Sequence, residues 1–175
     1  MTVETPSDIA FSPAVKAAQE ARGSRTTYAR MTDNRPWPDT ITPELAAFVE
    51  AQNSVFLASA SASGQPYIQH RGGPRGFLKI LGPRHMGFAD FAGNRQYITV
   101  GNLSENALIC LFLIDYEHAR RVKIWGRARV IEGDKALLDA LHVEGSRGRV
   151  ERAIVIEVGA WDVNCPQHIP RLAPV

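Results

Sequence analysis

The sequence predicts a mainly β protein, an antiparallel barrel or sandwich with peripheral helices, folded as a single structural domain. Short apolar segments bounded by glycine, proline and serine recur at close spacing from residue 53 onward. One of them, residues 122–131, alternates strongly between small or apolar side chains on one face and mainly polar side chains on the other, which is typical of a half-buried strand. Because strands and helices do not alternate along the chain, a doubly wound parallel sheet is not expected.

The N-terminal region differs from the rest of the chain. We expect residues 1–45 to form a helical extension with a connector, and residues 46–175 to form the barrel domain. Residues 1–11 are expected to be frayed or extended. Residues 26–40 are polar and contain prolines near their end, so they are expected to form the connector.

Three helices are indicated by residues that suit helix ends. Ser12, Thr42 and Asp134 each precede a segment of good helix formers, and each side chain can accept a hydrogen bond from a free N–H group of the first turn. Gly23 can end the first of these helices in a left-handed turn. The expected helices are residues 12–23, 42–52 and 134–143.

Short apolar or alternating segments predict six or seven strands. The expected strands are residues 54–61, 66–70, 77–81, 86–91, 107–115, 122–131 and 152–161. Residues 107–115, ALICLFLID, are almost continuously apolar, so we expect a central strand that is covered on both faces.

Composition excludes several classes of protein. The chain of 175 residues has a formal net charge of only +2, with scattered Lys and Arg, which argues against nucleic acid and acidic membranes as partners. No apolar segment reaches the length of a membrane span and no signal-peptide pattern opens the chain, so a cytoplasmic protein is expected. Cys110 and Cys165 form no CxxC motif and are expected to be free thiols. The five histidines are dispersed and no metal-binding motif occurs, so no metal is expected.

The segment 87–106 is the first candidate site. Asn94 can cap the helical segment that follows, and Arg95 in its first turn offers a planar set of donors suited to phosphate. An arginine there opposes the helix dipole, which a bound anion would explain. A solvated arginine at a turn is the equal alternative. Asp90, in an apolar strand, can bind a ligand polar group or cap the turn.

Three further groups of residues could carry chemistry. Arg71, Arg75 and Lys79 lie close together, either around a ligand or as cations guarding an edge strand. Trp125 lies on the cationic side of its strand, where it can stack on a flat ligand, pack at a subunit interface or lie on a solvated face. Residues 161–171 combine aromatic, amide, imidazole and guanidinium groups in a proline-bearing tail.

The order of these segments resembles the pyridoxamine 5′-phosphate oxidase-like family of FMN-binding split barrels. Lys79 lies at the family's distance before Asp90, and residues 94–96 take the place of the family's Ser-Arg-Lys. Residues 121–126, RVKIWG, are similar to the family's Gln-Val-Arg-(Ile/Val)-x-Gly strand.

The resemblance covers roughly residues 50–171. Near its end, Trp161 and Arg171 keep the family's spacing of ten residues. Within the family, the sequence is more similar to the group of predicted flavin-nucleotide-binding proteins, in which a Gly-Asn-Arg loop follows a Gly-Phe strand.

This resemblance implies an antiparallel, Greek-key-like split β-barrel that binds FMN. It also implies a homodimer with the flavin sites at the subunit interface. The residues expected at the cofactor are Arg71, Lys79, Asp90, Asn94, Arg95, Gln96, Arg121, Trp161 and Arg171. Trp125 and His168 are the candidates on the substrate side.

Several positions depart from the family pattern. Gln96 stands where the family has lysine, Arg121 replaces a glutamine, and Arg71 or Arg75 substitutes for an arginine of the first strand. The Tyr…Arg…Ser set that holds the substrate phosphate is missing from residues 142–153, which argues against vitamin B6 oxidation.

The sequence therefore predicts a flavin-dependent oxidoreductase acting on a small molecule. Three alternatives remain open at this point: a flavin carrier or sensor without turnover, a related barrel that binds deazaflavin or haem, and an interaction domain in which Arg95 is only a surface charge.

Overall fold

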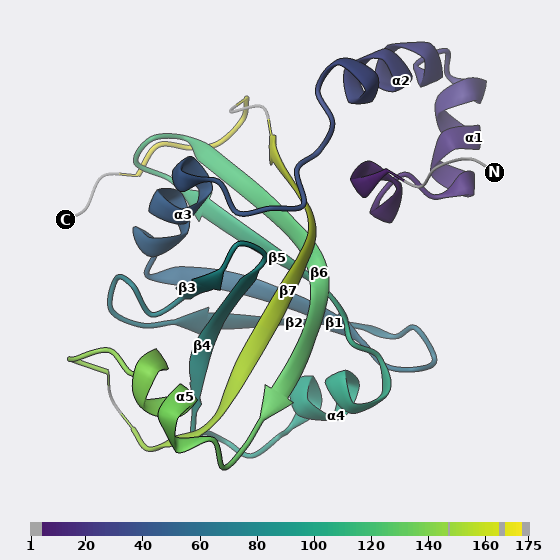
Figure 1. Ribbon diagram of the computed structural model, residues 1–175. Helices are drawn as coiled ribbons and strands as arrows, with labels where there is room; N and C mark the ends of the chain where they lie inside the picture. Colours follow the sequence, from purple (N-terminus) through teal and green to yellow (C-terminus); the bar gives the residue numbers. More distant parts are fainter. Residues whose placement is uncertain (1–4, 147, 165–166, 173–175) are drawn as a thin grey trace.

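The computed structural model describes residues 5–146, 148–164 and 167–172, which form one antiparallel sheet curled into a split barrel (Figure 1). The strands are β1 (Ser54–Ala60), β2 (Pro66–Gly72), β3 (Lys79–Gly82), β4 (His85–Phe91), β5 (Leu108–Asp115), β6 (Arg120–Ile131) and β7 (Val150–Asn164). Their order across the sheet is β2-β1-β5-β6-β7-β4-β3, and every neighbouring pair is antiparallel. The predicted mainly β fold class is confirmed.

The helices lie at the periphery of this sheet (Figure 1). They are the 3₁₀ helix η1 (Pro6–Ile9) and the α-helices α1 (Pro13–Ala21), α2 (Arg25–Asn34), α3 (Pro43–Glu50), α4 (Ile98–Glu105) and α5 (Lys135–Leu141). The side-chain oxygens of Ser12, Thr42 and Asp134 each accept a hydrogen bond from the backbone N–H three residues later. The three predicted caps are therefore confirmed.

Two predictions for the N-terminal region are wrong. The expected connector over residues 26–40 contains α2, because no proline interrupts the chain before Pro36 and Gly23, with φ of 72°, turns the chain back so that α2 packs on α1. Within the described part of residues 1–11, η1 replaces the expected extended chain, since Thr5 and Asp8 cap one another.

The core lies inside the curled sheet and is closed at one end by α3. Alternate residues of β1, β5 and β6 point inward, among them the fully buried Val55, Leu57, Leu111, Leu113, Val122 and Ile124. Helix α3 contributes Leu45, Phe48 and Val49 to the same cluster. Burial of a large aliphatic side chain contributes roughly 1.5–3 kcal/mol, so this alternation fixes which face of each strand points inward.

The two longest strands, β6 and β7, are joined by a ladder that contains a bulge. The register shifts between Trp125 and Gly126, and a Cβ at residue 126 would lie 2.0 Å from the carbonyl oxygen of Glu157. Only glycine leaves room for that close approach of the two backbones.

The outward side of β1, β2 and β5 is apolar and open. We call it the outer apolar face; it comprises Phe56, Ile68, Leu108, Phe112 and Ile114. Ile68 and Leu108 are 62% and 53% exposed, and Phe56 lies beside Phe112 in the register of the sheet. In the single chain, the prediction that residues 107–115 are covered on both faces is therefore wrong, because the covered core lies on one side only.

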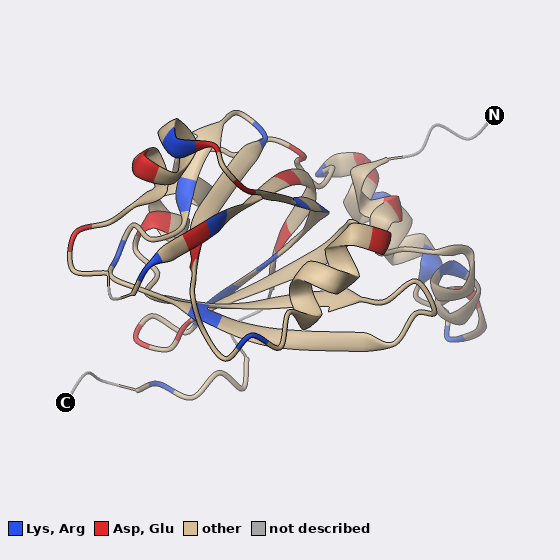
Figure 2. Cartoon of the chain, turned by 90° about the horizontal axis from the view of Figure 1, so that it is seen from below, with Lys and Arg blue, Asp and Glu red and all other residues tan. Residues whose placement is uncertain are grey.

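Charged residues of both signs are interspersed over the strands and helices (Figure 2). Among the described residues, no helix is long and apolar enough to cross a membrane.

Candidate functional site

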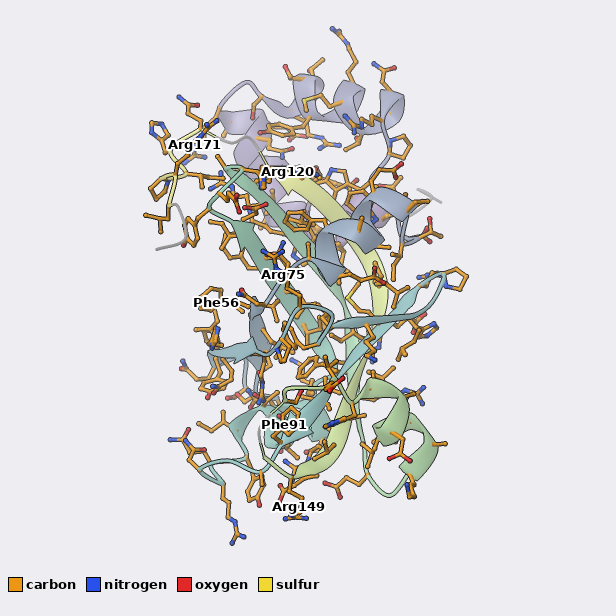
Figure 3. All side chains as sticks on the ribbon, turned by 90° about the vertical axis from the view of Figure 1, so that its left-hand side faces the viewer. Phe56, Arg75, Phe91, Arg120, Arg149 and Arg171 are labelled. Carbon is orange, nitrogen blue, oxygen red and sulfur yellow. The ribbon has the colours of Figure 1, made fainter. Side chains whose placement is uncertain are left out.

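A cavity of about 310 Å³ lies at the end of the barrel where β2, the end of β4, the first turn of α4 and the start of β7 meet. We call residues 92–97, which connect β4 to α4, the cavity loop. Phe91, one of the lining residues, marks this end of the molecule in Figure 3. The lining residues are Tyr67, Gln69, Arg71, Asp90, Phe91, Gly93, Asn94, Arg95, Gln96, Tyr97, Ile98, Thr99, Val100, Glu151 and Arg152.

The cavity loop has an unusual backbone. Arg95 and Tyr97 have φ of 61° and 53°, in the left-handed region that residues with a side chain seldom adopt. The side-chain oxygen of Asn94 accepts a hydrogen bond of 3.2 Å from the backbone N–H of Gln96, which closes a short turn. This turn delays the helix, so the prediction that Asn94 caps the helix and that Arg95 lies in its first turn is wrong.

Helix α4 begins at Ile98 and has no side chain at its N-terminus to accept hydrogen bonds. Its N-cap position is occupied by Tyr97, whose side chain makes no capping hydrogen bond. The first N–H groups of a helix have no intrahelical partner, and the helix dipole makes this end positive. An anion in the cavity could accept hydrogen bonds from these groups.

Two side chains beside this helix end are also without partners. Arg95 is exposed and makes no hydrogen bond or ion pair with any described residue. Thr99, in the first turn of α4, is only 4% exposed, lines the cavity, and has no hydrogen bond to the described part of the chain. Since buried hydroxyl groups are normally hydrogen-bonded, Thr99 is suited to meet a ligand.

Asp90 lies between two arginines on the wall of the cavity. One carboxylate oxygen accepts a bond of 2.6 Å from Nη1 of Arg71, and the other lies 3.3 Å from Nη1 of Arg152. The Asp90 side chain is only 6% exposed. A carboxylate in an apolar strand is tolerated here because both of its oxygens are paired with cations.

Arg152 is the most heavily paired cation of the site. Its Nε donates a hydrogen bond to Glu132 at 3.1 Å, and its Nη2 donates one to Glu151 at 2.7 Å. Its Nη1 donates to Asp90. Burial by itself would lower the pKa of Arg152, but the three carboxylates outweigh burial and raise its pKa above the usual value. The guanidinium carbon also lies 5.2 Å from the centre of the Tyr97 ring, so Arg152 supports the residue that precedes α4.

The pair formed by Arg71 and Asp90 joins two parts of the sheet that are not neighbours. β2 is an edge strand, and β3 pairs with β4 only as far as Gly87. Asp90 therefore lies where β4 has a strand on one side only, and Arg71 reaches it across the split of the barrel. Nε of Arg71 is buried and has no hydrogen-bond partner among the described residues.

Several polar lining residues were not predicted from the sequence. They are Tyr67, Gln69, Thr99, Glu151 and Arg152. The alternation in β2 could have revealed the first two, since Tyr67 and Gln69 lie on the same face of the strand as Arg71. Arg152 carries no clear local signal, because two of its three carboxylate partners, Asp90 and Glu132, are distant in sequence.

The predicted cofactor residues divide into two groups. The structure brings Arg71, Asp90, Asn94, Arg95 and Gln96 together around the cavity. Arg75 does not line the cavity, so of the two candidate arginines in this region Arg71 is the one that does.

Lys79 and Arg121 do not line the cavity. Lys79 opens β3 opposite Gly87, and Arg121 lies on β6 opposite Ile114. Nε of Arg121 is buried without a hydrogen-bond partner in the described part of the chain.

Trp125 and Trp161, which were predicted to lie at the ligand, contact the N-terminal region instead. The ring of Trp125 stacks on Trp37 with centroids 5.1 Å apart and planes 17° from parallel. The indole N–H of Trp161 donates to the carbonyl of Thr40 at 2.8 Å. The side of Trp125 that was expected to meet a flat ligand is thus occupied by the chain itself.

His168 and Arg171 lie in the C-terminal tail and are exposed. Arg171 lies at the opposite end of the molecule from Phe91 (Figure 3). Within one chain, these two residues do not contribute to the cavity.

No group of three or more metal-ligating side chains occurs among the described residues. Burial raises the pKa of the Cys110 thiol, so this cysteine is not activated as a nucleophile. Cys165 lies outside the described residues.

A family model described as pyridoxamine 5′-phosphate oxidase matches residues 41–165. The chain belongs to this family. The match begins just before α3, so η1, α1 and α2 lie outside it. No curated protein matches the sequence.

Solved structures show the same fold at low sequence identity. HupZ from Group A Streptococcus is 18% identical, with a TM-score of 0.57 over 76% of this chain and 99% of its own. A putative pyridoxamine 5′-phosphate oxidase from Lactobacillus delbrueckii is 18% identical, with a TM-score of 0.55 over 71% and 95%. An FMN-binding protein from Syntrophomonas wolfei is 12% identical, with a TM-score of 0.51 over 82% and 96%.

Proposed function

We propose that this protein is an FMN-binding flavoprotein that acts as an oxidoreductase on a small substrate. The observation that carries the proposal is the set of unused anion donors at one end of the cavity: Arg95, Thr99 and the uncapped N-terminus of α4. A phosphate monoester is the group that such a set suits, because it accepts hydrogen bonds from a guanidinium, a hydroxyl and backbone N–H groups together.

The rest of the cavity suits the remainder of a flavin. Tyr67, Gln69 and Arg71 give one wall a row of hydrogen-bonding groups, and Phe91 and Ile98 give it apolar surface. The buried Nε of Arg71, which has no partner, is a donor that a bound ligand or a local shift can satisfy. A cavity with apolar surface and a few fixed polar groups is typical of a cofactor site.

FMN, when bound, would supply the redox chemistry, and the protein would supply binding, orientation and electrostatics. Arg95 and Thr99 would hold the phosphate. Asp90 and Arg152 would keep Arg71 in place, and Tyr97 would fix the start of α4. The solved FMN-binding protein with the same fold supports this choice of cofactor.

We also propose that the protein is a homodimer. The outer apolar face exposes Ile68 and Leu108, and a second copy would remove this surface from water. Arg171 lies far from the cavity of its own chain (Figure 3), so if it contacts a flavin, that flavin is bound by another subunit.

The first test is a titration of the purified protein with FMN, followed by flavin fluorescence and the visible spectrum. We expect saturable binding, and Arg95→Ala should weaken it roughly tenfold or more, because a hydrogen bond to a charged group contributes about 1.5–3 kcal/mol. Arg75→Ala, an exposed arginine outside the cavity, is the matched control and should bind FMN like the wild type. A protein that takes up no FMN would overturn the proposal.

The second test addresses turnover. The FMN-loaded protein is mixed with NADH or NADPH in the absence of oxygen, and bleaching of the flavin band is followed before an acceptor is added. Bleaching and then recovery would support an oxidoreductase. A flavin that stays oxidised in the presence of both donors would favour a carrier. A dithionite-reduced flavin that no acceptor reoxidises would favour it as well.

A further inference from the structure

The arginines of the cavity differ in how they are paired. Arg71, Arg95 and Arg152 are the cations of the lining, and a cavity with three free arginines would attract several anionic groups. Asp90 balances two of these charges, since its oxygens pair with both Arg71 and Arg152.

Arg152 is paired with a carboxylate at every nitrogen. Each of its three nitrogens is within 3.3 Å of a different acid, namely Asp90, Glu132 and Glu151. Although it lines the cavity, only 8% of its surface is exposed. Arg152 is therefore a structural cation that holds Asp90 in place, and its charge is already balanced by carboxylates when an anion enters the cavity.

Arg71 is paired on one side only. Nη1 donates to Asp90, Nε is buried without a partner, and the guanidinium lies 5.9 Å from the centre of the Phe88 ring. It is thus fixed in orientation, with its charge balanced by a carboxylate at 2.6 Å. A fixed donor whose charge is already balanced suits an uncharged acceptor, such as the carbonyl edge of a heterocycle, better than a second anion.

Arg95 is the remaining lining arginine, and its charge is not balanced by any described residue. Thr99 is 4% exposed, has no hydrogen bond to the part of the chain that the structure describes, and lies in the first turn of the uncapped helix that follows. The groups that favour an anion are therefore gathered at the cavity loop and α4.

We propose that Asp90 acts as a built-in counter-ion that reserves Arg71 for the uncharged ring edge of the ligand and leaves the phosphate to Arg95, Thr99 and the N-terminus of α4. This inference rests on the proposed function and adds the orientation of the ligand. Asp90 is a positioning residue in this scheme, and Arg71 is assigned to the ring instead of the phosphate.

The test compares FMN with riboflavin, which has the same ring and no phosphate. Arg95→Ala and Thr99→Val should weaken FMN roughly tenfold and threefold and leave riboflavin affinity within twofold of the wild type. Arg71→Met should weaken both flavins by the same factor, since the ring is common to them. Arg75→Ala is again the matched control.

The counter-ion role of Asp90 is tested with inorganic phosphate as the competitor. In the wild type, phosphate should compete with FMN and should not compete with riboflavin. In Asp90→Asn, the charges of Arg71 and Arg152 are no longer balanced by this carboxylate, so phosphate should also displace riboflavin. A merely structural role for Asp90 would weaken both flavins without creating this new competition.

The outcomes separate the two proposals. If neither flavin binds the wild type, both proposals are overturned. If FMN binds but Arg71→Met weakens FMN alone, Arg71 is a phosphate ligand and only the orientation is overturned. If Asp90→Asn does not fold, Arg71→Met and the wild-type competition still decide the assignment, because each predicts a different result for riboflavin.

Discussion

The two ends of the barrel differ in whether their candidate ligand-binding side chains already have partners within the chain. At the end near the N-terminal helices, Trp125 is stacked on Trp37 and the indole of Trp161 is bonded to Thr40, so the chain covers its own aromatic residues. At the cavity end, Arg95 and Thr99 have no partner among the described residues. One end is closed by the chain itself, and the other has groups suited to a ligand.

This difference shows what distinguishes a site from a stabilising cluster. An aromatic or an arginine in a short motif has the same local appearance in both places. The presence or absence of a partner in the folded chain decides which role it can have, since unpaired buried polar groups cost free energy unless a ligand satisfies them. The following predictions test this contrast, beginning with the largest effect.

Removing Arg152 should have the largest effect on stability. Arg152→Met leaves Asp90 and Glu151 without their shared cation, and breaking a buried ion pair costs about 3–5 kcal/mol. The free energy of unfolding, measured by urea titration, should fall by this amount. Arg149→Met is the control, because Arg149 pairs with Glu151 on the surface and should change stability by less than about 0.5 kcal/mol. Equal effects of the two substitutions would contradict the structural role of Arg152.

Removing Trp37 should affect the closed end only. Trp37→Ala deletes the stacking on Trp125 and the contact with Phe11, which should lower the free energy of unfolding by about 2 kcal/mol. Flavin affinity should stay within twofold of the wild type, because Trp37 does not line the cavity. Met31→Ala, on an exposed face of α2, is the control. A large loss of flavin affinity would show that the two ends are coupled.

The backbone of the cavity loop provides a third test. Because Arg95 has φ of 61°, Arg95→Gly should be more stable than Arg95→Ala by about 1 kcal/mol, since glycine adopts this conformation without strain. Both variants should lose FMN affinity alike, because both lack the guanidinium. Thermal and urea unfolding of the two variants measure the difference. If the alanine variant is the more stable one, the loop has no such strain.

The smallest expected effect is a pH dependence at the closed end. Burial raises the pKa of Asp162, against the backbone hydrogen bond of Val163 and the charges of Lys123 and Arg35. The folded state therefore binds this proton more tightly than the unfolded state, so the contribution of Asp162 to stability falls as the pH rises from about 4 through its raised pKa. Asp162→Asn should remove this pH dependence of the free energy of unfolding, which amounts to a few tenths of a kcal/mol. Asp139→Asn, on the surface of α5, should keep it. A slope unchanged in Asp162→Asn would contradict the assignment.

Much of the architecture could be predicted from the sequence because it depends on local chemistry. The caps at Ser12, Thr42 and Asp134 act within three residues, and the alternation of residues 122–131 directly shows which face is buried. Helix α2 was missed, because its polar surface gives no apolar periodicity. The helix start after Asn94 was misplaced, because an Asn can close a turn as readily as it can cap a helix.

From the sequence alone one could predict the positions of the strands along the chain, the inward face of β6 and an arginine-bearing loop after β4. Which of the polar residues are paired depends on the folded chain. Asp90 meets Arg71 from 19 residues away and Arg152 from 62 residues away, and Trp125 meets Trp37 across a larger separation still. Such partners are brought together by sheet register and by the split of the barrel, which no short motif contains. The physical reason is that a charge is neutralised by whatever lies within a few ångströms of it, and chain folding sets those neighbours.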